Sequence, residues 1–223
     1  MSIGTTNERS LHASLKEWYA QPGDRVEKEV DGFIIDICRD DLLVEIQTRN
    51  FSSVRRKLAA LARDHPVRLV HPIAREKWIV RLAADGLSQL GRRKSPKRGT
   101  PLQVFDELVY CPELMSEPNV SLEVLLIRED EVRRALVRPG RRRRPWRRYD
   151  RRLINVVERM VFEGPADFRA LLPEELPRPF TTRDLAQGLG QPRHLAQQMA
   201  YCLRKMGAIA VVGKRGNALL YSV

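Results

Sequence analysis

The chain has 223 residues, 43% of them hydrophobic, and its 40 Lys and Arg exceed its 28 Asp and Glu, which gives a formal net charge of +12. This composition excludes a disordered chain and suits one large domain or two small ones. No apolar run reaches the roughly 20 residues that a membrane helix needs, and the polar start MSIGTTNERS lacks a signal-peptide core. We therefore expect a cytoplasmic protein that does not enter a membrane.

Helices and strands are predicted to alternate over the first 83 residues. Residues 6–20 predict a helix with Leu11, Leu15 and Trp18 on its apolar face. After it come two strand-like runs (29–38 and 42–48), a helix (52–65) with Phe51, Val54, Leu58 and Leu61 on one face, and two more strands (67–74 and 76–83). The order is α-β-β-α-β-β, or α-β-β-β-α-β if the first run is split. It predicts an α/β fold in which helices flank a mixed central sheet.

The middle of the chain is less regular. It predicts a basic connector (91–100), a helix (101–110), a strand (121–129) and a further helix (150–162). We divide the chain into an α/β domain (1–135), an Arg-rich linker (136–152) and a C-terminal part (153–223) with a helical connector.

The positive charge is concentrated in residues 138–152, which hold nine Arg, one Asp and no Lys. Guanidinium groups suit two-pronged contact with phosphate better than ammonium groups do. The segment therefore predicts a polyanionic partner, most commonly nucleic acid, although a solvated basic linker is the alternative. The candidate phosphate contacts are Arg141, Arg142, Arg143, Arg144, Arg147 and Arg148.

The last 45 residues predict two helices and two strands. Thr181 or Thr182 caps the first helix, Gly190 and Pro192 form a turn, and a second helix covers 193–206. The strands 208–213 and 218–223 flank KRGN. This order resembles a winged helix-turn-helix, which implies DNA contact through Arg193 and Gln197 on the recognition helix and Lys214 and Arg215 on the wing. Protein contact is the alternative use of the same fold.

Two acids interrupt the strand-rich stretch DGFIIDICRDDLLVEIQT (31–48). A hairpin that turns at Asp40 and Asp41 places Asp36 opposite Glu45, with Gln47 on the same face. Like charges directly opposite each other destabilise a hairpin, so a bound cation or a raised pKa should offset them. Converging carboxylates suit Mg²⁺ or Mn²⁺, and Asp36 and Glu45 are the candidate metal ligands.

This pattern resembles the PD-(D/E)XK nuclease superfamily, and its Holliday junction resolvase-like branch in particular. Asp36 matches the hairpin acid, Glu45 the second acid, and Gln47 stands where the family has lysine. The resemblance, over about residues 7–75, implies a restriction-endonuclease-like core that hydrolyses DNA with a divalent metal. It also leaves a homodimer open, because two strands need two active sites.

Two further residues complete the candidate site. Lys57 borders the apolar stripe of its helix, so it could lean over the sheet and supply the charge that Gln47 lacks. Glu8 lies at the edge of the first helix's apolar face and is the candidate helix acid, although complementing the helix dipole is an equal alternative. The site residues are thus Glu8, Asp36, Glu45, Gln47 and Lys57.

The sequence therefore predicts a Mg²⁺-dependent DNA endonuclease with a C-terminal winged-helix domain. A DNA-binding regulator that keeps the fold without catalysis is the alternative, and Gln47 is its main support. An RNA-binding protein is a third option, favoured by the arginine run.

Overall fold

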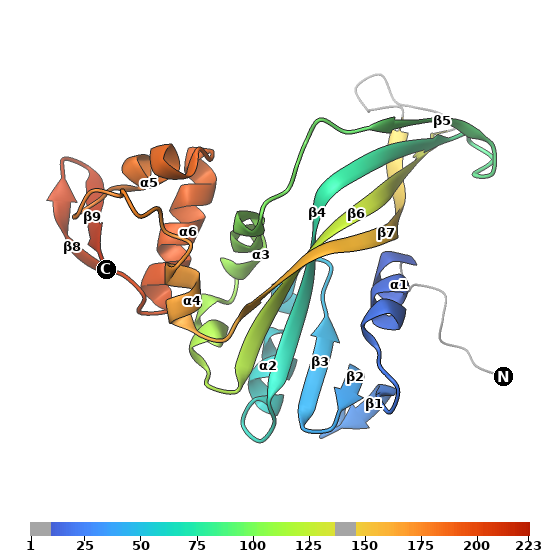
Figure 1. The fold of residues 1–223 in the computed structure, drawn as a ribbon, viewed down its shortest axis with the longest axis horizontal. Coiled ribbons are helices and arrows are strands. Elements are labelled where there is room, and N and C mark those ends of the chain that lie inside the picture. Colours follow the sequence, from blue (N-terminus) through green and yellow to red (C-terminus); the bar gives the residue numbers. More distant parts are fainter. Residues whose placement is uncertain (1–9, 137–145) are drawn as a thin grey trace. The chain divides into compact units, whose positions relative to one another are not determined.

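The computed structural model describes residues 10–136 and 146–223 (Figure 1). The first half contains α1 (Ser10–Tyr19), β1 (Arg25–Val30), β2 (Phe33–Arg39), β3 (Leu42–Ile46), α2 (Arg55–Leu61), β4 (Val67–Leu82) and β5 (Gln89–Lys94). The second half contains α3 (Phe105–Leu108), β6 (Val120–Ala135), β7 (Trp146–Phe162), α4 (Pro165–Arg169), α5 (Thr182–Leu189), α6 (Arg193–Lys205), β8 (Ala210–Arg215) and β9 (Ala218–Ser222). Single 3₁₀ turns occupy Phe51–Ser53, Pro101–Val104 and Pro112–Ser116.

A mixed sheet is the centre of the fold. Its strands follow the order β1-β2-β3-β4-β6-β7, and β5 pairs with β4. The strands β1, β2 and β3 are antiparallel neighbours, whereas β3 and β4 are parallel and joined through α2. The predicted α/β class and mixed sheet are confirmed, and the first strand-like run is indeed split, at Asp31 and Gly32.

The chain divides into two compact units. Unit 1 comprises Met1–Pro22, Pro72–Thr100 and Leu125–Arg159, and unit 2 comprises Gly23–His71, Pro101–Val124 and Met160–Val223. The long strands β4, β6 and β7 each contribute residues to both units. No helix in the described ranges is long and apolar enough to cross a membrane.

Several predicted elements match the structure closely. The face of α2 and its preceding turn buries Phe51, Val54, Leu58 and Leu61, as expected. At the C-terminus, Thr181 caps α5 by accepting hydrogen bonds from the N–H groups of Arg183 and Asp184. Gly190 has φ 60°, which suits a residue without a side chain at the end of a helix.

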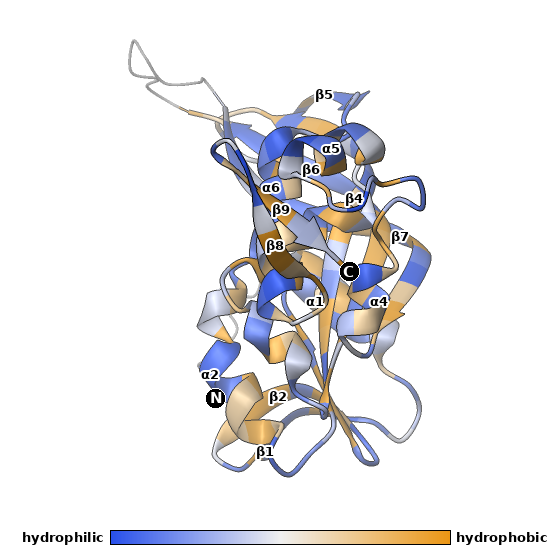
Figure 2. Ribbon diagram, turned by 90° about the vertical axis from the view of Figure 1, so that its left-hand side faces the viewer, coloured by the Kyte–Doolittle hydropathy of each residue, from blue (hydrophilic) through white to orange (hydrophobic). Residues whose placement is uncertain are grey.

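Other predictions were wrong. The helix expected over 150–162 is part of strand β7, so residues 146–152 of the expected linker are also strand. Its apolar residues happened to fit a helical period, but several are β-branched, and the pairing with β6 decides the outcome. The hydrophobic and hydrophilic positions that follow one another along β7 are visible in Figure 2. The two strands expected over 67–83 are one strand, β4, and the basic connector includes β5.

The first helix turns a different face inward than expected. Leu11, Leu15 and Tyr19 are buried, whereas Trp18 is 42% exposed. The buried face therefore follows a spacing of four residues rather than the expected step of three from Leu15 to Trp18. The guanidinium carbon of Arg159 lies 5.7 Å from the centre of the Trp18 ring. A cation–π contact thus covers the aromatic ring that we had assigned to the core.

The three cysteines are buried and free. Burial raises the pKa of the Cys111 thiol to about 11 and that of Cys202 to about 12. Both thiols therefore stay protonated at neutral pH and pack as apolar side chains.

Candidate functional site

The β2–β3 hairpin has the predicted register next to its turn, but its ladder ends at the Ile37–Val44 pair, before the expected Asp36–Glu45 pair. Ile37 pairs with Val44 and Cys38 with Leu43, around a turn at Asp40 and Asp41. Asp36 and Glu45 occupy the next positions after the Ile37–Val44 pair. Because side chains alternate along a strand, both acids lie on the opposite face from Ile37 and Val44. The expected separation of acids from the buried isoleucines is therefore present.

The two strands separate at the position of these acids. After Val44, β3 continues to pair with β4, and Ile46 is the partner of Val70. The N–H of Ile46 donates a hydrogen bond to Oδ2 of Asp36 at 2.8 Å, where a continuous ladder would use a backbone carbonyl. The Asp36 carboxylate therefore lies beside the backbone of the residue that follows Glu45.

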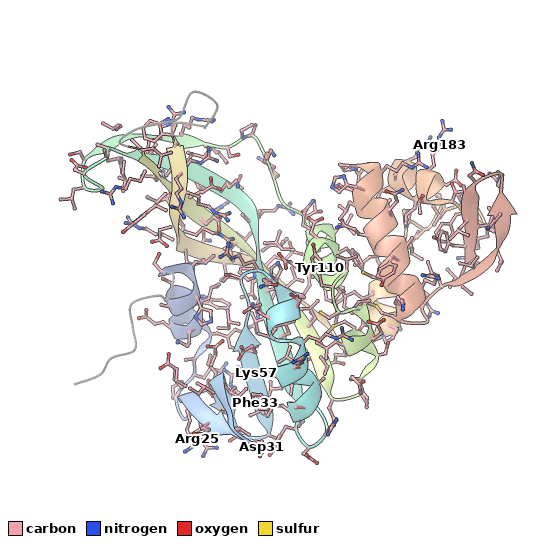
Figure 3. All side chains as sticks on the ribbon, turned by 180° about the vertical axis from the view of Figure 1, so that it is seen from behind. Arg25, Asp31, Phe33, Lys57, Tyr110 and Arg183 are labelled. Carbon is pink, nitrogen blue, oxygen red and sulfur yellow. The ribbon has the colours of Figure 1, made fainter. Side chains whose placement is uncertain are left out.

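Lys57 of α2, labelled in Figure 3, contacts both strands at this position. Its Nζ donates a hydrogen bond to Oε2 of Glu45 at 2.6 Å and another to the carbonyl oxygen of Ile34 on β2. The Lys57 and Glu45 side chains are only 18% and 9% exposed, so water screens this ion pair weakly. The structure thus brings together Asp36, Glu45 and Lys57, from two strands and a helix.

Gln47 takes a different direction. Its Nε2 donates hydrogen bonds to the carbonyl oxygen of Asn50 at 3.1 Å and to Oγ of Ser53 at 3.0 Å. The backbone carbonyl oxygen of Gln47 lies 2.7 Å from Nδ1 of His71. Because a carbonyl oxygen only accepts hydrogen bonds, Nδ1 carries the proton. Gln47 therefore orders the loop that leads into α2. His71 is buried against Phe51.

The carboxylates suit a hard divalent cation. Mg²⁺ in proteins usually keeps several waters and takes one or two carboxylate ligands, and Asp36 and Glu45 match that donor set. In the part of the chain that the structure describes, no group of three or more His, Cys, Asp or Glu side chains is placed to hold a metal. A metal here would thus depend on two carboxylates with water or substrate oxygens.

The C-terminal elements form a second candidate surface. Arg193 and Gln197 are exposed on α6, and Lys214 and Arg215 are exposed where β8 turns into β9. An open pocket of about 600 Å³ is lined by residues of α5, α6 and this hairpin, among them Arg183, Arg193 and Arg215. Sequence reasoning missed Arg183, although an exposed arginine in the first turn of α5 could have indicated it (Figure 3).

The remaining predicted site residues divide into two groups. Arg147 and Arg148 are exposed on β7. Glu8 and the run Arg141, Arg142, Arg143 and Arg144 lie outside the described residues.

Comparison with known proteins places the chain in a family. A family model described as a domain of unknown function, DUF8091, matches residues 9–163. The chain belongs to this family. It is also similar to an uncharacterized protein of Treponema pallidum (strain Nichols), with 34% identity over 223 residues that cover 99% of this chain and 87% of that protein. No solved structure matches the chain.

The DUF8091 segment contains all of the elements from α1 to β7, and with them the hairpin acids, Lys57, Arg147 and Arg148. The elements α4 to β9, with the arginine-lined pocket, follow the matched segment. The hairpin site therefore lies within the DUF8091 segment, whereas the C-terminal surface lies outside it. The similarity to the Treponema protein nevertheless extends over both.

Proposed function

We propose that the chain is a metal-dependent DNA endonuclease with a restriction-endonuclease-like core and a C-terminal winged helix-turn-helix that holds duplex DNA. The observation that carries the proposal is the buried contact of Lys57 with Glu45, beside Asp36, at the point where β2 and β3 separate. The element order α1-β1-β2-β3-α2-β4 supports it, because the resemblance implied that core.

Each side chain has a distinct part in this proposal. Asp36 and Glu45 would hold Mg²⁺ or Mn²⁺, which when bound would polarise the scissile phosphate and lower the pKa of a water molecule. Lys57 would provide the positive charge that the PD-(D/E)XK superfamily has on the lysine at the place of Gln47. Its contact with Glu45 fixes the direction of that carboxylate. Gln47 would hold the loop before α2 and not take part in the chemistry.

The C-terminal pocket supports the DNA-binding half of the proposal. Three guanidinium groups, from Arg183, Arg193 and Arg215, line a pocket wide enough for a phosphate and its sugar. Exposed Gln197 lies one helical turn beyond Arg193, where it can reach a base edge. Cutting both strands requires two active sites, so the proposal includes a homodimer.

The test is nicking of supercoiled plasmid in Mg²⁺ or Mn²⁺. Glu45→Gln and Lys57→Ala should each slow nicking by about 100-fold or more, the usual size of losing one electrostatic contact with the transition state. Arg56→Ala, an exposed neighbour of Lys57 on α2, is the matched control and should nick like the wild type. Nicking that survives Glu45→Gln unchanged would contradict the proposal.

A second candidate is a DNA-binding adaptor without catalysis. It is favoured because two of the candidate catalytic side chains already have structural contacts: Asp36 accepts a hydrogen bond from a backbone N–H, and Gln47 donates one to the loop before α2. A wild-type chain that binds plasmid but nicks it no faster than Glu45→Gln would support the adaptor.

A further inference from the structure

Unit 1 carries a surface that the proposed nuclease does not use. Its described residues include 17 Lys and Arg but only 8 Asp and Glu, a formal net charge of +9. Acids in this unit lie close to the basic residues. Glu76, for example, accepts hydrogen bonds from Lys94 and Arg128 at 2.6 and 2.9 Å. Because the cations still outnumber the acids about twofold, the unit favours an anionic partner.

Aromatic rings are interspersed among these cations. Trp78 on β4 pairs with Lys94 on β5, and Val80 pairs with Arg92. Both cations lie over the Trp78 ring, with Arg92 at 4.9 Å and Lys94 at 5.2 Å from its centre. Basic side chains alternating with aromatic rings on a sheet are typical of surfaces that bind unstacked nucleic-acid bases.

The most developed part of this surface is a pocket of about 520 Å³ in unit 1. Three arginines line it, Arg134, Arg147 and Arg148, together with Tyr149 and the small side chain of Ala84. Its described lining contains no Asp or Glu. The volume lies within the range of pockets that hold small ligands, and it exceeds what a single phosphate needs.

Two side chains of the pocket are arranged for different parts of a nucleotide. Arg134 is held in place, because its Nε donates to the carbonyl oxygen of Ala84 at 2.9 Å and its Nη2 donates to the same oxygen. Its guanidinium carbon lies 6.0 Å from the centre of the Tyr149 ring. Tyr149 is 62% exposed, so one part of an amphipathic ring is left to solvent.

We propose that unit 1 binds single-stranded DNA, with a base stacked on Tyr149 and adjacent phosphates on Arg134, Arg147 and Arg148. An exposed aromatic ring gains from an unstacked base, whereas the faces of bases in a duplex are already covered by their neighbours. The choice of DNA over RNA rests on the proposed function. The strand-binding site itself does not depend on cleavage.

The test is the binding of labelled dT20 to the full chain in EDTA, which removes any cleavage and so keeps this proposal separate from the nuclease. Tyr149→Ala should raise the dissociation constant for dT20 by about 10-fold, the usual effect of losing one stacked base. Binding of a duplex of the same length should change less than about twofold, since phosphate contacts remain.

Two matched variants control for structure. Tyr149→Phe keeps the ring and should bind dT20 like the wild type. Tyr110→Ala removes a tyrosine of unit 2 that is 61% exposed and should also leave dT20 binding unchanged. A crosslinking experiment on the wild-type chain gives an independent test. A photoactivated 5-iodouracil oligonucleotide should crosslink to the peptide that contains Tyr149.

Several outcomes would overturn the proposal. They are wild-type affinity in Tyr149→Ala, an equal loss of duplex binding in that variant, or a crosslink confined to other peptides. Tighter binding of rU20 than of dT20 by the wild type would replace DNA with RNA as the partner.

Discussion

Units 1 and 2 have almost the same composition of basic residues but opposite charge balance. Each has 17 described Lys and Arg, yet unit 1 has 8 Asp and Glu whereas unit 2 has 19. Unit 2 contains the hairpin acids and Lys57, and unit 1 contains the exposed Tyr149 and its arginines. The net charge of the whole chain therefore hides a division: the excess of basic over acidic residues lies in unit 1, whereas Asp36, Glu45 and Lys57 lie in unit 2.

The largest expected effect tests whether cleavage depends on the acids of unit 2 while DNA binding does not. Asp36→Asn and Glu45→Gln keep the size of each side chain but remove its charge. We expect each to lower the rate of plasmid nicking by about 100-fold or more, while the affinity for DNA in EDTA stays within about twofold. Nicking assays at saturating DNA, with fluorescence anisotropy, measure the two effects. A parallel loss of affinity would mean that unit 2 acids also determine binding.

Substitution of Lys57 tests whether the stability of unit 2 depends on the ion pair between Lys57 and Glu45. Lys57→Ala removes the ammonium group that contacts the buried Glu45, and we expect the free energy of unfolding to fall by about 3–5 kcal/mol. Urea denaturation measures this change. Adding Glu45→Gln to Lys57→Ala should restore part of the stability, because the buried negative charge is then gone. If the double variant is less stable than Lys57→Ala, the buried charge was not the cause.

The arginines of unit 1 give a smaller, salt-dependent effect. Replacing Arg147 and Arg148 with Ala should reduce the slope of log affinity for dT20 against log salt by about 1.4, near 0.7 for each phosphate contact on a single strand. Titrations at several salt concentrations measure it. The matched control replaces two exposed arginines of unit 2, Arg25 and Arg63, and should leave the slope unchanged. Equal slopes in both double variants would remove the distinction between the units.

The smallest effect concerns the cap of α5. Thr181→Ala removes the acceptor for two backbone N–H groups and should lower the free energy of unfolding by about 1 kcal/mol. Hydrogen bonds from Thr181 lower the pKa of Asp184 below its ordinary 3.8. The stability that Asp184 provides is therefore complete above that ordinary value and is lost as the pH falls through the lower pKa. Thermal unfolding of the wild type and Asp184→Asn should thus converge at acidic pH.

Part of the fold could be predicted because its causes are local. The register of the β2–β3 hairpin follows from a two-residue turn and strict alternation, and Ile37 and Val44 pair as expected. Lys57 was placed correctly near the sheet because the angle between successive residues of a helix is fixed. The separation of the strands was not predictable, since it requires the pairing of Ile46 with Val70, which is distant in the sequence.

Other errors have the same origin. The residues of β7 fit a helical and an extended pattern almost equally well, and pairing with β6 resolved the ambiguity. Gln47 is an exception: it follows the last residue of β3, and its hydrogen-bond partners Asn50 and Ser53 are near it in the sequence. Elements were thus predicted correctly where neighbours in the sequence set the geometry, as in the β2–β3 hairpin, and incorrectly where pairing with a distant strand did, as in β7.

The hydrogen bond from Ile46 N–H to Asp36 has a consequence for how this family would change over evolutionary time. A relative without the proposed hydrolysis would still need an acceptor oxygen at this position, because a buried N–H without a partner is costly. Selection for folding would therefore preserve Asp, or at most exchange it for Asn. An acid at this position in a related sequence is therefore expected for folding alone, and the presence or loss of Glu45 together with Lys57 is the better guide to whether a relative keeps the proposed catalysis.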